Sequence, residues 1–93
     1  MVRRMAEVHL DAMLREFSSR RDFVSEAPTV GDLLDELERD APRLRYKLRD
    51  ETGALRRYVK IFVDGEDVSR APDLRVSLSG VRTVDILHSI AGG

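Results

Sequence analysis

The chain contains no cysteine and no tryptophan, and it has only three phenylalanines and two tyrosines among its 93 residues. Without cysteine there is no disulfide framework, no thiol nucleophile and no thiolate metal site, and a reducing compartment is acceptable. No apolar run approaches the roughly 20 residues that a membrane-spanning helix needs. The first segment, MVRRMAEVHLDAM, has early arginines but no apolar stretch behind them, which is unlike a signal peptide. These absences favour a cytoplasmic protein.

The chain also lacks an excess of charge of either sign. The 16 basic and 17 acidic residues leave a net charge of −1, so no overall field favours nucleic acid or an anionic membrane as partner. Hydrophobic residues make up 42% and charged residues 35%, a composition typical of a globular domain. We expect a single domain over residues 1–93, with a core too small to enclose an active site and a flexible tail at 89–93.

The N-terminal part predicts two strands followed by a helix. Apolar and polar residues alternate from Glu7 to Ala12, the pattern of a half-buried strand, and a polar turn at 18–21 leads to a second strand near 22–26. Thr29 is a good helix N-cap with Asp32 three residues later, and a proline at 42 ends the helix. Its apolar stripe consists of Val30, Leu33, Leu34 and Leu37.

Two more strands follow in the C-terminal half. The segment YVKIFV predicts a strand with Val59, Ile61 and Val63 on one face, and the Asp64-Gly65 pair predicts a tight turn. The segment TVDILHSI predicts the last strand, with Val84, Ile86 and His88 on one face and Asp85 and Leu87 on the other. One helix packed on one face of a mixed sheet is an α+β arrangement. This order of elements fits the ubiquitin-like β-grasp fold.

Four segments carry a resemblance to a known family. VHLDAMLREF, TVGDLLDEL, VKIFVDGEDV and the terminal TVDILHSIAGG resemble the ThiS/MoaD family of β-grasp sulfur carriers, and together they cover nearly the whole chain. That family includes the carrier of cysteine biosynthesis, the thiamin sulfur carrier and the small subunit of molybdopterin synthase. Its most specific feature is the Gly92-Gly93 ending. The sequence departs from the family at His88, where a proline is usual, and at SGVRT, where the turn is usually an acidic Gly-Asp turn.

The resemblance implies a function for the ending. Residues without large side chains, Ala91, Gly92 and Gly93, are able to extend through the narrow channel of a separate activating enzyme. That enzyme uses ATP to adenylate the Gly93 carboxylate, and sulfur from a persulfide or sulfide then replaces AMP. The resulting thiocarboxylate donates sulfur to a biosynthetic enzyme for cysteine, a cofactor or a thio-metabolite. The chain itself is then no enzyme and binds no cofactor.

The resemblance also implies a docking face for the activating and accepting enzymes. The strand patterns place Phe62 and Leu87 on the sheet face opposite the helix, where a monomer exposes few large apolar groups. We expect these two residues and His88 to form that face. The alternatives are that loops of the chain cover this side, or that the strand register is shifted by one residue.

Other candidate sites are weaker. His9 and His88 are the only histidines and lie on different predicted strands, without further ligands at metal-binding spacing, so we expect no metal site. The basic run RLRYKLR, residues 43–49, is either a patch for RNA or an acidic partner or a solvated face, and its interruption by RDE favours the solvated face.

Three other functions stay open for this fold. The chain is alternatively a molybdopterin synthase small subunit that stays bound to a large partner, a ubiquitin-like modifier joined to lysines through Gly93, or an interaction module with an inert terminus. We expect a monomer when it is free.

Overall fold

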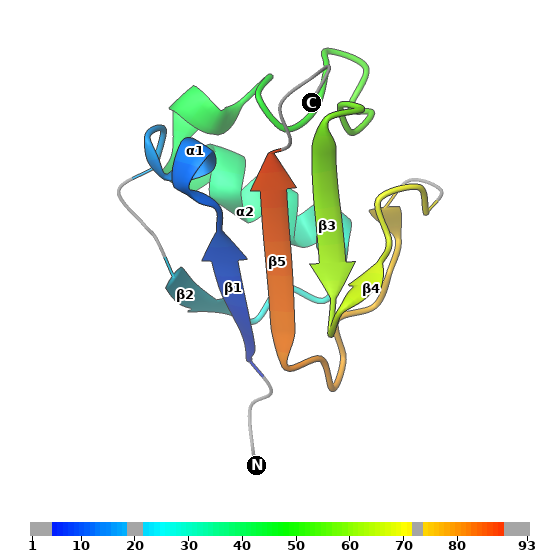
Figure 1. Ribbon diagram of the computed structural model, residues 1–93. Coiled ribbons are helices and arrows are strands. Elements are labelled where there is room, and N and C mark those ends of the chain that lie inside the picture. The colour runs from blue at the N-terminus through cyan, green and yellow to red at the C-terminus, as the bar shows by residue number, and fades with distance from the viewer. Residues whose placement is uncertain (1–4, 19–21, 72–73, 89–93) are drawn as a thin grey trace.

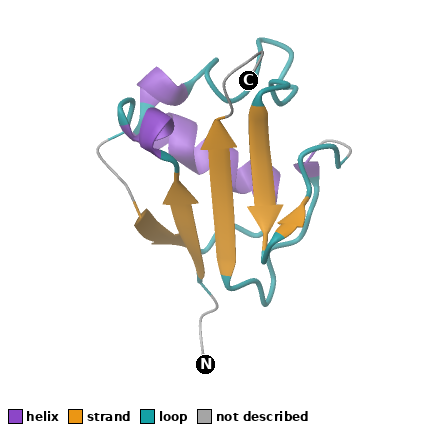
Figure 2. Ribbon diagram, in the orientation of Figure 1, coloured by secondary structure: helices purple, strands orange, loops and turns teal. Residues whose placement is uncertain are grey.

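Five strands form one mixed sheet in the order β2-β1-β5-β3-β4, and helix α2 lies across one of its faces (Figures 1 and 2). The computed structural model describes residues 5–18, 22–71 and 74–88. The strands are β1 (Ala6–Leu10), β2 (Asp22–Ser25), β3 (Val59–Val63), β4 (Glu66–Asp67) and β5 (Thr83–His88). The helices are α1 (Ala12–Arg15), α2 (Val30–Asp40) and the 3-10 turn η1 (Pro42–Leu44). The predicted α+β class is confirmed.

The central strands β1 and β5 run parallel, and the other neighbours pair antiparallel. Every second residue of β1, β3 and β5 is buried against α2, as the period of two along a strand requires. Ile61 and Ile86 lie opposite each other and are fully buried, which confirms the predicted register of β3 and β5. From α2 the core receives Val30, Leu33, Leu34 and Leu37.

The main helix begins and ends close to where its sequence predicts. The Thr29 hydroxyl accepts a hydrogen bond from the Asp32 amide at 3.1 Å and donates one to the Asp32 carboxylate at 2.7 Å. These bonds satisfy one of the free amides of the first turn and orient the acidic side chain at the positive helix end. The helix ends at Asp40, and Pro42 then opens η1, since its fixed φ suits a first helical position.

The prediction for the first strand is wrong at its end. Strand β1 stops at Leu10, and the next residues turn into α1 because the Asp11 carboxylate caps that helix by accepting from the Leu14 amide at 3.0 Å. A short polar side chain of this kind competes with the strand ladder for backbone amides.

Strand β4 was not predicted. It consists of two exposed acidic residues without a hydrophobic pattern. The Asp64-Gly65 turn produces it: both residues have positive φ, 49° and 85°, the geometry of a two-residue hairpin turn.

Candidate functional site

The end of β5 is the described part of the predicted sulfur-carrying site. Residues Ala91, Gly92 and Gly93 lie outside the described residues, and the last described residue before them ends β5. That residue is His88, at the end of the sheet where α1 also lies (Figure 1). The contacts of His88 therefore decide where the terminal segment begins.

A backbone hydrogen bond and a ring contact hold His88. Its backbone amide donates to the second carboxylate oxygen of Asp11 at 2.5 Å, although the two residues are 77 positions apart. Its ring lies against the Tyr58 ring, with the centroids 4.6 Å apart and the planes tilted by 57°. The ring atom Nδ1 is buried and has no hydrogen-bond partner among the described residues. The position of His88 is thus held through its backbone and by ring packing.

Phe62 and Leu87 lie on the open face of the sheet, as predicted, and Figure 1 shows no helix over this face in the described part of the chain. Leu87 is 38% exposed, and Phe62 is half-buried. The register pairs Lys60 with Leu87 and Phe62 with Asp85, which makes Phe62 and Leu87 diagonal neighbours. The alternative of a shifted register is therefore wrong.

His88 does not share this face. It follows Ile86 at a spacing of two and so lies on the side of the buried residues, where it contacts Tyr58. Its inclusion with Phe62 and Leu87 was wrong for that reason. The apolar pair is instead bordered by polar and charged side chains of β1, β3 and β5, which include Glu7, His9, Lys60 and Asp85.

His9 forms the best-defined polar contact of the open face. Its Nδ1 lies 2.9 Å from the Asp22 carboxylate, which joins β1 to the edge strand β2, and Glu7 is 3.9 Å from its other ring nitrogen. The hydrogen bond with Asp22 raises the pKa of His9 above its ordinary value. No three metal-ligating side chains converge anywhere in residues 5–18, 22–71 and 74–88.

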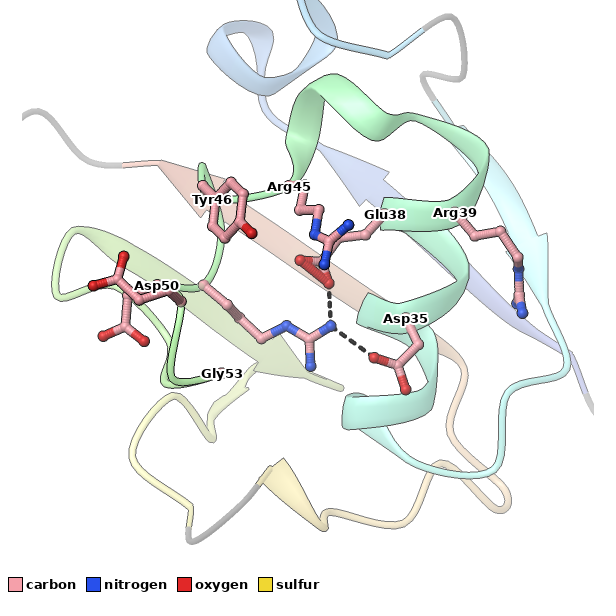
Figure 3. A pocket seen from close by; sticks show the side chains of 9 residues that line it. Asp35, Glu38, Arg39, Arg45, Tyr46, Asp50 and Gly53 are labelled. Atoms are coloured by element: carbon pink, nitrogen blue, oxygen red, sulfur yellow. Dashed lines mark hydrogen bonds and ion pairs between the residues drawn. The ribbon is translucent and has the colours of Figure 1, made fainter.

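A hollow of about 400 Å³ lies between α2 and the loop after η1 (Figure 3). Arg49 crosses it and pairs with Asp35 at 2.7 Å and with Glu38. Burial lowers the pKa of Arg49, but the hydrogen bonds with Glu38 and Asp35 outweigh this effect and raise it. Charges of both signs line this groove, so it favours no ligand of either charge.

The interpretation of residues 43–49 as a solvated basic face is confirmed for the exposed Arg43, Arg45 and Lys47 and is wrong for Arg49. The Arg49 side chain is only 18% exposed and holds the loop to α2. Arg43 and Lys47 lie over the Phe17 ring at 5.4 and 4.7 Å from its centroid. Leu44 and Leu48 are fully buried. The apolar residues of this alternating segment thus serve packing, while three of its basic residues stay at the surface.

Within the described residues, no helix has the length and apolar character needed to cross a bilayer. This result concerns the helices of residues 5–18, 22–71 and 74–88 alone.

Comparison with known proteins gives consistent similarities. The ThiS family model matches residues 8–93. The sulfur carrier protein CysO of Mycobacterium tuberculosis is 30% identical over 89 residues, which cover 92% of this chain and 96% of that protein. In the crystal structure of the Amycolatopsis orientalis BexX/CysO complex, the matching chain is 26% identical with a TM-score of 0.78, covering 95% of this chain and 99% of that one. The small archaeal modifier protein 1 of Methanosarcina acetivorans is 25% identical with a TM-score of 0.75, covering 97% and 99%.

Proposed function

The chain belongs to the ThiS family of ubiquitin-like sulfur carriers, and from this membership we propose that it carries sulfur as a thiocarboxylate on Gly93. The single observation that carries the proposal is the match to this family over residues 8–93, which includes the Gly-Gly ending. The chain acts as a protein co-substrate, and partner enzymes supply the catalytic groups.

The proposed cycle has two chemical steps. In the first, a Gly93 carboxylate oxygen attacks the α-phosphorus of ATP and pyrophosphate leaves, which produces an acyl-adenylate. In the second, hydrosulfide attacks the acyl carbon, AMP leaves, and the proton of the new thioacid is released to solvent. A carboxylate is a poor electrophile, and adenylation supplies the leaving group that the second step needs. An activating enzyme holds the ATP, because this chain has no glycine-rich loop at the start of a helix to hold a triphosphate.

Docking to partner enzymes is proposed for the open face of the sheet. Leu87 is a large apolar residue with substantial exposure, and Phe62 is its diagonal neighbour. Leu87 directly precedes His88, so a partner bound there also lies close to the start of the terminal segment. A CysO protein of similar fold has been crystallised in complex with BexX, which supports partner binding by this type of carrier.

Intact mass spectrometry tests the proposal. The protein is incubated with ATP, sodium sulfide and an activating enzyme shown to be active on another carrier of the family. We expect a mass gain equal to the exchange of one oxygen for sulfur, and no gain for a chain lacking Gly93. A Thr52→Ala chain, altered in an exposed loop, is the matched control and should gain sulfur normally. The absence of a gain in the intact chain would refute the proposal.

A second candidate is a ubiquitin-like modifier, favoured by the similarity to small archaeal modifier protein 1. Here a lysine amine attacks the same acyl-adenylate, AMP leaves and an isopeptide bond forms. Tryptic peptides carrying the 11-residue remnant TVDILHSIAGG on lysine, which cleavage after Arg82 leaves, would establish this function if they are found only with the complete chain and ATP. Thiocarboxylate formation without such peptides would support the sulfur-carrier function and refute the modifier function.

A further inference from the structure

Asp11 forms hydrogen bonds with all of its polar groups, and they join three parts of the fold. Its backbone amide donates to the Ile86 carbonyl of β5 at 3.1 Å, and its carbonyl accepts from the Arg15 amide of α1 at 3.1 Å. One carboxylate oxygen caps α1 by accepting from the Leu14 amide at 3.0 Å. The other accepts from the His88 amide at 2.5 Å.

The bond from the His88 amide to the Asp11 carboxylate replaces a backbone hydrogen bond that the β1–β5 pair would otherwise make. In a parallel pair, a strand residue donates its amide to one residue of its neighbour and accepts, through its carbonyl, from a residue two positions further on. Asp11 makes the first bond, to Ile86, but its carbonyl has turned into α1. The second bond would come from His88. The Asp11 carboxylate accepts it in place of the carbonyl, so β5 stays paired for one residue beyond the end of β1.

We propose that Asp11 is a positioning residue for the reaction at the C-terminus. By holding the His88 amide, it fixes the position and direction of the last described residue before the C-terminal segment that the activating enzyme must bind. This inference rests on the proposed sulfur-carrier function and adds a residue to it. Asp11 acts through His88 and takes no part in the chemistry.

A charged acceptor makes this bond stronger than a neutral one. The ring of His88 does not substitute for it, since Nδ1 has no partner in the described residues and the ring only packs against Tyr58. Loss of the carboxylate would therefore remove the bond between the His88 amide and the β1 side of the sheet, while His88 stays opposite Val59 of β3. The energetic cost would appear in the association of the carrier with its activating enzyme, where the His88 backbone must be fixed again.

Two substitutions separate the His88 bond from the helix cap. Asp11→Asn keeps one oxygen for the Leu14 amide but offers an NH₂ group to the His88 amide, and two donors do not bond. Asp11→Ser also caps a helix well, and its shorter side chain does not span both sites. Thr29→Ala is the matched control, because it removes a similar cap from α2, away from the end of β5.

The test measures adenylation of each chain by an activating enzyme of the family, as release of pyrophosphate from ATP, together with hydrogen exchange of the His88 amide. For both Asp11 variants we expect faster exchange and a KM for the carrier raised on the order of tenfold, a factor that corresponds to about 1.4 kcal/mol, with kcat unchanged. Thr29→Ala should lower stability and leave KM as it is.

Three results would overturn the inference. If the His88 amide exchanges faster while KM stays unchanged in both variants, Asp11 has only a structural role. If both variants keep the amide protected, the bond does not hold the strand end. If the intact chain is not adenylated at all, the proposed function is wrong and this inference is wrong with it. If the intact chain is adenylated normally, either of the first two results refutes only the role of Asp11.

Discussion

Replacing Arg49 by methionine should destabilise the fold by leaving a carboxylate without its partner. The Glu38 side chain is only 13% exposed and the Arg49 side chain 18%. Removing one member of a buried ion pair costs about 3–5 kcal/mol, because the remaining charge is desolvated without compensation. Since both groups keep some contact with water, we expect about 2–3 kcal/mol here. For a domain of this size that loss lowers Tm by roughly 10–20 °C.

Urea unfolding of three variants tests this reasoning. Asp35→Asn removes the other ion-pair partner of Arg49. Because the Asp35 side chain is 62% exposed, this substitution should lower the free energy of unfolding by less than about 1 kcal/mol. Arg49→Met combined with Glu38→Met should recover most of the loss, since no buried charge then remains. A double variant as unstable as Arg49→Met alone would refute the account, because the loss would then come from packing of the arginine stem.

Four further substitutions, at three positions, test local features by urea unfolding. His9→Gln should lower the free energy of unfolding by less than about 1 kcal/mol at pH 5, because the His9–Asp22 pair is exposed. Since the folded pKa of His9 is raised, this difference is fully present below the unfolded pKa of about 6.5 and disappears as the pH rises through the folded pKa. A difference that persists at pH 9 would contradict it. His88→Phe should raise stability by about 1 kcal/mol, since it removes an Nδ1 that has no partner among the described residues and keeps the ring on Tyr58; a loss would show that the nitrogen is paired. Gly65→Ala should cost about 1 kcal/mol through its φ of 85° alone, because nothing lies within 4 Å of the added Cβ, and Gly65→Asn should cost less. Equal losses for alanine and asparagine would contradict that cause.

Local periodicity was sufficient for the main elements. The spacing of leucines in α2 and the alternation in β3 and β5 identify the buried faces, since a helix and a strand repeat with different periods. The helix cap at Thr29 and the Asp64-Gly65 turn each involve residues within four positions of one another, so the sequence also predicts them. Family resemblance, which depends on linear segments, was confirmed on the same basis.

Contacts between distant segments were decided by the tertiary structure. Asp11 reads as one more polar residue of an alternating strand, and its bond to His88 exists only because β1 and β5 lie side by side. Arg49 reads as one of several surface bases, and its pairing with Glu38 depends on how the loop after η1 folds back on α2. Hydrogen bonds and ion pairs of this kind have no period along the chain, because their partners are brought together by strand order and loop path. The sequence by itself therefore determined the buried faces of α2, β3 and β5 and which family the chain resembles, and the tertiary structure alone decided what holds the last residue of β5 in place.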